Sequence, residues 1–128
     1  MFDNEFYKNL KKPNFTPPSS IFKLVWPVLY ILMAISLFLI LISSSALKTM
    51  AVSIFIFQLF LNIVWSPVFF IFGKIRLALI ISILLTVSVL FMMFIFYEIS
   101  VLACFLQIPY FLWLCFATVL NWNFVKLN

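Results

Sequence analysis

Four long stretches of the sequence contain no charged residue, and they determine what the chain can fold into. They comprise residues 24–47, 49–73, 77–97 and 99–125, which is 24, 25, 21 and 27 residues. An α-helix needs about 20 apolar residues to cross the hydrocarbon core of a bilayer. Only a helix satisfies every backbone polar group within such a segment, and these stretches lack the alternation of a membrane β-strand. The sequence therefore predicts an all-α, polytopic membrane helix bundle.

We expect four transmembrane helices near residues 21–42, 51–72, 77–97 and 101–125, within a single domain that covers residues 1–128. Residues 1–20 form a basic arm before the first span. The connections between spans are short, so consecutive helices run antiparallel. The composition agrees with a membrane protein, because 67% of the residues are hydrophobic and only 9% are charged. An ordinary soluble enzyme is excluded, since soluble domains carry about 25% charged residues.

The basic residues are distributed unevenly between the two ends of this predicted bundle. Seven of the eight lie in the arm, at the start of the first span (Lys23), in the connection at 73–76 or at the C-terminus, and Lys48 alone lies at the other end. Lys and Arg are enriched in cytoplasmic loops. We therefore expect both termini in the cytoplasm of a multi-pass protein. The same asymmetry explains the net charge of +5 without a nucleic-acid partner.

Apart from Lys23 at the start of the first span, the predicted spans contain no acidic or basic residue, since Glu98 lies in the last connection. Charged groups inside a membrane usually mark ion and proton pathways, so ion-coupled transport is disfavoured. The chain also has no His, which removes the commonest metal ligand and general base. The sequence predicts no metal site and no cofactor.

Three of the predicted spans carry aromatic and uncharged polar residues at helical spacing. One such stripe alone is typical of helix–helix packing. Three together also suit a cavity for a large, flat, mostly apolar ligand that a few hydrogen bonds orient. The stripes are Trp26, Tyr30, Met33 and Leu37; Gln58, Asn62, Trp65 and Phe69; and Tyr110, Trp113, Ala117 and Asn121.

The third span instead repeats a small residue every four positions, at Ala78, Ser82 and Thr86. Small residues at this spacing let two helices approach closely. The pattern fits a contact within the monomer and equally a homodimer face. Bends at Pro67 and Pro109, by contrast, are expected to splay neighbouring helices and to help open a pocket.

Four motifs follow one another along the chain. Residues 6–13 read FYKNLKKP and are followed by TPP at 16–18, while residues 25–30 read VWPVLY and are followed by Met33. Residues 62–70 read NIVWSPVFF, and residues 109–121 contain PYFLW, FAT and LN. In this order they resemble the motifs of the tryptophan-rich sensory protein (TspO/MBR) family, which includes the mitochondrial translocator protein or peripheral-type benzodiazepine receptor.

The resemblance implies a helix bundle around a pocket for tetrapyrroles such as protoporphyrin IX or haem. In some members it also implies sterols, isoquinolines or benzodiazepines as ligands. Tryptophans that match Trp26 and Trp113 line the pocket of the family, the position of Ala117 lies at its wall, and the segment 6–18 acts as its lid. We accordingly predict a ligand-binding site formed by Trp26, Tyr30, Asn62, Trp65, Tyr110, Trp113, Ala117, Leu120 and Asn121.

The chain departs from the family pattern in several places. The family has five helices, and the first precedes the motif that begins here at Phe6. The chain is therefore expected to be either a four-span member or a member whose start has been misassigned. Phe6 replaces a Trp, and Ile81 stands at a position that is often acidic. Trp122 replaces the central Tyr of the sterol-recognition pattern in animal members, which weakens the expectation of sterol binding.

Three hypotheses about function follow from these observations. The first is a membrane receptor, sensor or carrier for a tetrapyrrole. The second is a porphyrin-degrading enzyme in which Trp26 and Trp113 carry radical chemistry, because the spans offer no general acid or base. The third is a non-catalytic subunit of a larger membrane complex, whose stripes serve only packing.

Overall fold

The computed structural model describes residues 19–127, and these form five helices and no strand. Four helical segments in this range, at 24–41, 48–70, 75–99 and 101–127, are long and apolar enough to cross a membrane. The prediction of an all-α membrane bundle is therefore confirmed. The predicted arm lies outside the described residues up to position 18. The helices are α2 (Ser19–Leu41), α3 (Lys48–Phe70), α4 (Ile75–Ile99), α5 (Val101–Leu106) and α6 (Ile108–Leu127).

α3 and α4 extend beyond the limits expected from the sequence because charged residues lie inside their ends. α3 begins at Lys48 rather than near 51, and α4 covers 75–99 rather than 77–97. A charged side chain ends the apolar segment, but its long stem lets the helix continue while the charge reaches water. Arg76 and Glu98 consequently lie in the first and last turns of α4.

The fourth span is not the single helix that was expected over 101–125. α5 ends at Leu106 and α6 begins at Ile108, so the span is broken at Gln107. Pro109 has no amide hydrogen and cannot continue the hydrogen bonds of α5. The backbone N–H of Gln107 donates to Cys104 O at 3.0 Å, in a tighter turn. Pro67, by contrast, lies inside the continuous helix α3.

α3 and α4 are joined by a tight reversal at Gly73. Its φ of 66° lies in the left-handed region, which glycine adopts without steric cost. The backbone N–H of Lys74 donates back to Val68 O at 3.0 Å, which satisfies one of the last carbonyls of α3. The reversal places the two helices side by side, and they form the most extensive helix–helix contact of the bundle.

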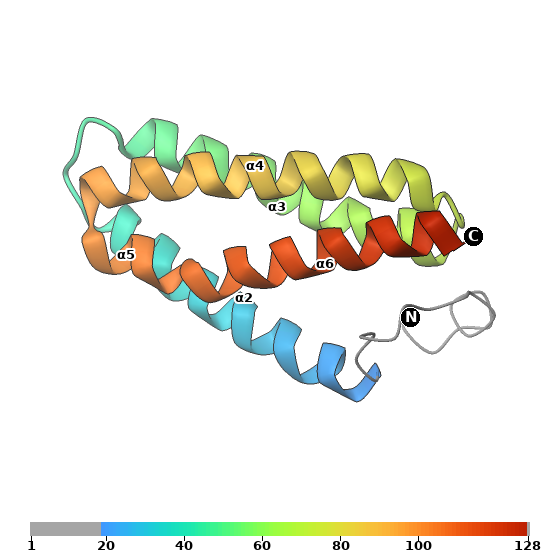
Figure 1. Cartoon of the computed structure of the whole chain (residues 1–128). Helices are drawn as coiled ribbons and strands as arrows, with labels where there is room; N and C mark the ends of the chain where they lie inside the picture. The colour runs from blue at the N-terminus through green and yellow to red at the C-terminus, as the bar shows by residue number, and fades with distance from the viewer. Residues whose placement is uncertain (1–18, 128) are drawn as a thin grey trace.

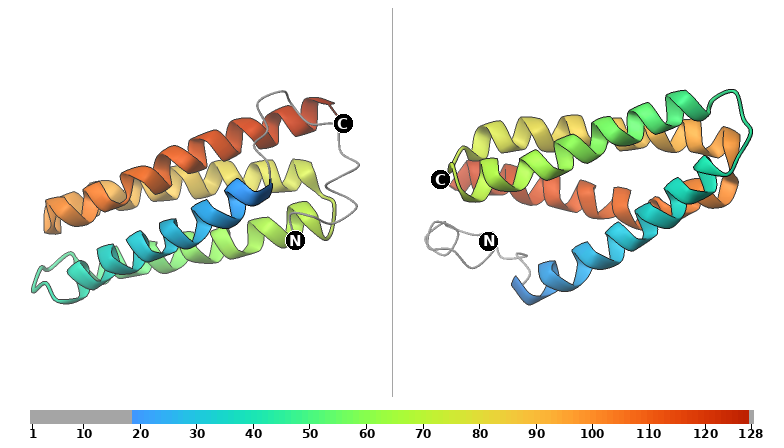
Figure 2. Two further views of the ribbon diagram at one scale, coloured as in Figure 1. Left: turned by 90° about the horizontal axis from the view of Figure 1, so that it is seen from below. Right: turned by 180° about the vertical axis from the view of Figure 1, so that it is seen from behind.

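α4 is the most buried span and packs on both α3 and α6. α2 packs mainly on α5 and diverges from α3 and α6 toward its N-terminal end (Figures 1 and 2). The 73–76 reversal and the C-terminal end of α6 lie at the same end of the bundle (Figure 1). That end is the one predicted to be cytoplasmic, and its side of the membrane stays a prediction.

The small residues of α4 face α6 within the chain. Ala78 and Ser82 are 0% and 2% exposed. The Ser82 hydroxyl shares a hydrogen bond with the hydroxyl of Thr118, and Thr86 Oγ1 lies 3.1 Å from the same Thr118 oxygen. Of the two interpretations of this pattern, the structure supports the contact within the monomer.

Candidate ligand-binding site

Asn62 lies at the centre of a hydrogen-bond network that connects α2, α3 and α6. Its Oδ1 accepts a hydrogen bond from the Tyr30 hydroxyl, and its Nδ2 donates to the Tyr110 hydroxyl at 2.9 Å. The Tyr110 hydroxyl in turn donates to Gln58 Oε1 at 2.7 Å. Asn62, Tyr110 and Gln58 are all buried. Because a polar group left unpaired in hydrocarbon is costly, this network fixes how the three helices are rotated against one another.

The helical repeat explains why these side chains meet. Gln58 and Asn62 lie one turn apart on α3, so that both face the single hydroxyl of Tyr110. Asn62 contacts Tyr30 through its Oδ1, and Tyr110 through its Nδ2. The Tyr30 side chain is 40% exposed, because α2 diverges from the bundle at this level. The phenol ring of Tyr30 is therefore the part of the network nearest to the surrounding lipid.

Two tryptophans from different helices form the aromatic wall beside this network. The ring centroids of Trp26 in α2 and Trp113 in α6 lie 6.4 Å apart, with the ring planes at 89°. Trp26 also lies 5.9 Å from Tyr30, and Trp113 lies 5.5 Å from Phe116. The edge-to-face contact between Trp26 and Trp113 contributes about 0.5–1.5 kcal/mol beyond the burial of the two rings. The wall joins α2 to α6 where the two helices begin to diverge.

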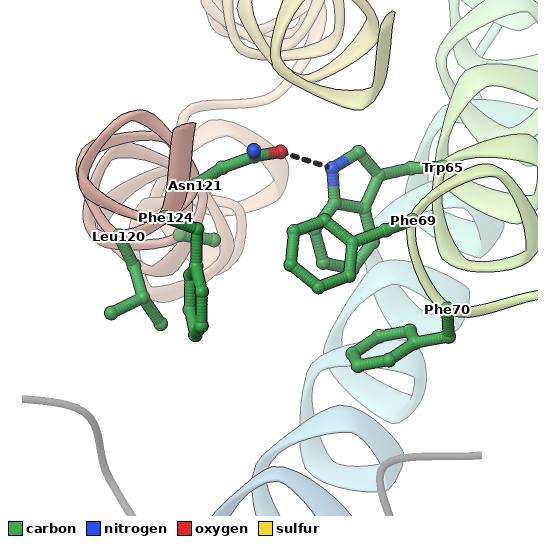
Figure 3. A pocket seen from close by; sticks show the side chains of 7 residues that line it. Trp65, Phe69, Phe70, Leu120, Asn121 and Phe124 are labelled. Carbon is green, nitrogen blue, oxygen red and sulfur yellow. Dashed lines mark hydrogen bonds between the residues drawn. The ribbon is translucent and has the colours of Figure 1, made fainter. Parts of the chain in front are cut away.

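Trp65 is held in place by a clamp from α6. Its Nε1 donates to Asn121 Oδ1 at 3.0 Å, and Asn121 Nδ2 donates to the backbone oxygen of Ile75 at 3.1 Å (Figure 3). The Trp65 ring stacks on Phe69, with centroids 5.3 Å apart and an interplanar angle of 26°. Asn121 thereby links α3, the start of α4, and α6.

Two small hollows adjoin these residues. One, which we call the inner hollow, has a volume of about 10 Å³ and is lined by Trp26, Asn62, Trp65, Ser82, Leu85, Leu114 and Ala117. The other, the end hollow, has a volume of about 20 Å³ and lies between α3 and α6 (Figure 3). Each has room for about one water molecule. The end hollow is lined by Trp65, Phe69, Phe70, Ala117, Leu120, Asn121 and Phe124.

The structure brings the nine predicted site residues into one continuous region. Six of them line the two hollows, which share Trp65 and Ala117 and are therefore adjacent. The remaining three contact these six: Tyr30 and Tyr110 through Asn62, and Trp113 through the ring of Trp26. That the region binds a ligand stays a prediction. The six are Trp26, Asn62, Trp65, Ala117, Leu120 and Asn121.

Four lining residues belong neither to the predicted site nor to the aromatic stripes and small-residue repeat of the spans. Phe70 and Phe124 face the end hollow, and Leu85 and Leu114 face the inner hollow. Eighteen Phe residues occur in the chain, so a single Phe carries no signal. The position of Phe124, three residues after Asn121, is the one clue that the helical repeat offers.

Among residues 19–127 there is no group of three or more His, Cys, Asp or Glu side chains that could hold a metal ion. The hydrogen-bonding groups described above are amides, hydroxyls and an indole. What the region offers a ligand is therefore aromatic surface with a few neutral hydrogen-bonding groups.

Comparison with known proteins identifies the family of the chain. The sequence matches the TspO/MBR family over residues 1–127. The chain belongs to the TspO/MBR family. This TspO/MBR protein is therefore a multi-pass integral membrane protein, in agreement with its four membrane-spanning segments.

Curated relatives of this TspO/MBR protein come from bacteria and from eukaryotes. The tryptophan-rich sensory protein of Cereibacter sphaeroides is 34% identical over 125 residues, which are 98% of this chain and 78% of the relative. Protein CrtK of Rhodobacter capsulatus is 30% identical over 125 residues, 96% of this chain and 78% of the relative. The human translocator protein is 32% identical over 120 residues, 91% of this chain and 71% of the relative. The names of these relatives describe a sensory protein and a translocator.

Proposed function

We propose that this protein is a membrane-embedded receptor, sensor or carrier for tetrapyrroles such as protoporphyrin IX or haem. The observation that carries the proposal is the gathering of Trp26, Trp65 and Trp113 around two adjacent hollows. Indole rings offer flat apolar surface on which a macrocycle stacks. A few polar groups then orient the ligand, here the amides of Asn62 and Asn121.

The hollows are smaller than a tetrapyrrole, so the helices must separate for the ligand to enter. Clefts that hold ligands of this kind have volumes of roughly 300–1,000 Å³. The N-terminal half of α2 is the element best placed to move, because α2 packs mainly on α5. Its side-chain contacts at this level include the Trp26–Trp113 ring contact and the Tyr30–Asn62 hydrogen bond. A bound macrocycle would replace the ring contact with stacking on both indoles.

The test is a titration of the detergent-solubilised full chain with protoporphyrin IX. We expect the porphyrin to quench tryptophan fluorescence saturably. Because replacing a Trp alters that signal, the affinity of variants is measured from the absorbance of the porphyrin itself. The double variant Trp26→Phe, Trp113→Phe should bind at least tenfold more weakly than the wild type.

The matched control is Trp122→Phe, since Trp122 lies on the outside of α6 and is 52% exposed. This variant should keep the affinity of the wild type. Linear quenching without saturation, or equal affinity in all three proteins, would refute a specific pocket.

A second candidate is light-dependent degradation of the bound porphyrin. The edge-to-face contact between Trp26 and Trp113 favours it, because neighbouring indoles can supply an electron to a photo-excited ring and share the resulting radical. Oxygen would take that electron as superoxide, the indole radical would recover an electron from the porphyrin, and superoxide would add to the resulting porphyrin radical cation. The net change is the addition of one O2 to the macrocycle, whose ring then opens, and the indoles are restored. A porphyrin that is bound, illuminated in air and keeps its absorbance would exclude this activity. The protein would then be a binding protein only.

A further inference from the structure

A separate groove runs along the outside of the bundle between α4 and α6. Its volume is about 310 Å³, and it is lined by Leu79 and Ile83 of α4 and by Thr118, Val119 and Trp122 of α6. This volume falls at the lower end of the range for ligand clefts, roughly 300–1,000 Å³. Ile83 and Val119 are 47% and 49% exposed, so the groove opens to the surroundings of the bundle. We call it the outer groove.

The outer groove is separated from the inner hollow by a hydrogen-bonded wall. Ser82 lines the inner hollow, whereas Thr118 lines the outer groove. The hydroxyls of these two residues share a hydrogen bond, and Thr86 Oγ1 lies 3.1 Å from the Thr118 oxygen. A molecule in the outer groove is therefore outside the region proposed for tetrapyrroles.

Two cations stand at the end of the outer groove nearest the 73–76 reversal. Lys126 lies one turn beyond Trp122 on α6, and its Nζ is 4.6 Å from the centroid of the Trp122 ring. Arg76 lies three residues before Leu79, which places it on the groove side of α4. Both cationic side chains are exposed. The outer groove therefore has a mostly apolar lining and basic side chains at one end.

No acidic side chain of the described residues is near these cations. The one carboxylate side chain among residues 19–127 is Glu98, in the last turn of α4. It lies 22 residues beyond Arg76 in the same helix. At 1.5 Å per residue this is about 33 Å, which is the thickness of the hydrocarbon core. Within residues 19–127, no carboxylate side chain therefore pairs with Arg76 or Lys126, and an anionic lipid head group is the complement that a bilayer offers at this level.

We propose that the outer groove, with Arg76 and Lys126, binds one anionic phospholipid. One acyl chain lies in the groove, and the phosphodiester lies between the two cations. Basic pockets between membrane helices are typical sites for anionic head groups. The Arg76 guanidinium suits a phosphate because it donates two parallel hydrogen bonds, and Lys126 adds a point charge. Trp122 stands beside Lys126, at the interfacial level where tryptophan is enriched.

The experiment compares two lipids that have the same acyl chains and head groups of different net charge. The full chain in detergent is incubated with phosphatidylglycerol or with phosphatidylcholine of the same acyl chains, and retained lipid is counted by native mass spectrometry. We expect one phosphatidylglycerol to remain bound at concentrations tenfold below those at which phosphatidylcholine does. The double variant Arg76→Gln, Lys126→Gln should lose about tenfold in affinity for phosphatidylglycerol.

Two further variants separate charge from shape. Lys48→Gln removes a cation at the opposite end of the bundle and should leave phosphatidylglycerol binding unchanged. Val119→Trp fills the groove while it keeps both cations, and it should weaken phosphatidylglycerol binding as well. Porphyrin affinity should stay the same in every one of these variants, since the Ser82–Thr118 wall intervenes.

Equal retention of the two lipids would overturn the proposal, and so would an equal loss in Lys48→Gln. Retention of cholesterol in place of phosphatidylglycerol would also overturn it, because a sterol makes no use of the two cations. Each variant is melted in detergent beforehand, so that a lost lipid is counted only for a folded protein.

Discussion

Trp26 and Trp113 meet edge to face, with ring centroids 6.4 Å apart and planes at 89°. This contact and the Tyr30–Asn62 hydrogen bond tie the diverging half of α2 to the rest of the bundle. Both ties lie beside the inner hollow, which Trp26 and Asn62 line. The ligand entry that we propose therefore requires both ties to break, because an outward movement of α2 separates Trp26 from Trp113 and Tyr30 from Asn62.

Ala117 lines both hollows, so a larger side chain at this position should block ligand entry. We expect Ala117→Leu to lower porphyrin affinity at least tenfold, as measured by absorbance titration. Overpacking of this kind destabilises a protein by about 1–3 kcal/mol, so melting of the variant is recorded alongside. Ala34→Leu, at an exposed position of α2, is the control and should bind as the wild type does. Unchanged affinity in Ala117→Leu would show that the ligand lies elsewhere.

Asn62 joins three helices, so its replacement should lower the free energy of unfolding. Asn62→Leu leaves the Tyr30 hydroxyl without its acceptor and removes the donor to Tyr110. We expect the free energy of unfolding in detergent to fall by about 1–2 kcal/mol, since hydrogen bonds between membrane helices contribute about 0.6–1.7 kcal/mol each. In Asn123→Leu, which removes only a bond to Val119 O in the same helix, the change should be under half of this. Equal effects of the two variants would contradict a special role for the network.

Gln58 and Gln107 are both 0% exposed, yet they differ in their partners. Gln58 accepts from Tyr110, whereas neither side-chain amide atom of Gln107 has a hydrogen-bond partner within residues 19–127. A buried unsatisfied amide costs about 1–3 kcal/mol. Gln107→Leu should therefore raise the free energy of unfolding, and Gln58→Leu should lower it. Urea titrations in detergent with circular dichroism measure both, and a loss of stability in Gln107→Leu would argue against this assignment.

Thr118 holds α4 and α6 together through Ser82 and Thr86. Thr118→Val keeps the shape of the side chain and removes the hydroxyl, so stability should fall by about 1 kcal/mol. A double-mutant cycle with Ser82→Ala isolates the bond between the two hydroxyls, with an expected coupling of about 0.5–1 kcal/mol. Thr49→Val, at an exposed position of α3, serves as the reference. A coupling near zero would mean that the two helices pack equally well without this bond.

Much of the bundle was predictable because the bilayer imposes a simple rule. A segment with no charge over about 20 residues has to cross the membrane as a helix, and all four such segments do. The break at Gln107 was not predictable from Pro109 alone. Pro27 and Pro67 also occur in apolar segments, and both lie inside unbroken helices. Neighbouring packing decides which proline interrupts a helix, and a single sequence does not contain that information.

The residues of the candidate region were predictable where their types are rare among the apolar residues of the spans. Trp, Tyr and Asn are scarce inside the spans, so their helical spacing stood out and the structure brings them together. Phe and Leu are abundant, and the sequence could not distinguish Phe124 or Leu85 from lipid-facing copies of the same residue. The pairing of a particular amide with a particular ring, such as Asn121 with Trp65, depends on how the helices are rotated. Residue spacing along the sequence does not determine that rotation.

The Ser82–Thr118 hydrogen bond also bears on how small molecules should be screened against this protein. It belongs to the wall between the inner hollow and the outer groove. If both proposed sites bind, two compounds would occupy the protein together without competing. A displacement assay that follows a porphyrin would score a compound in the outer groove as inactive. A label-free readout, such as a shift in melting temperature, would detect compounds in either place. The two readouts together would show whether a compound binds beside the inner hollow or in the outer groove.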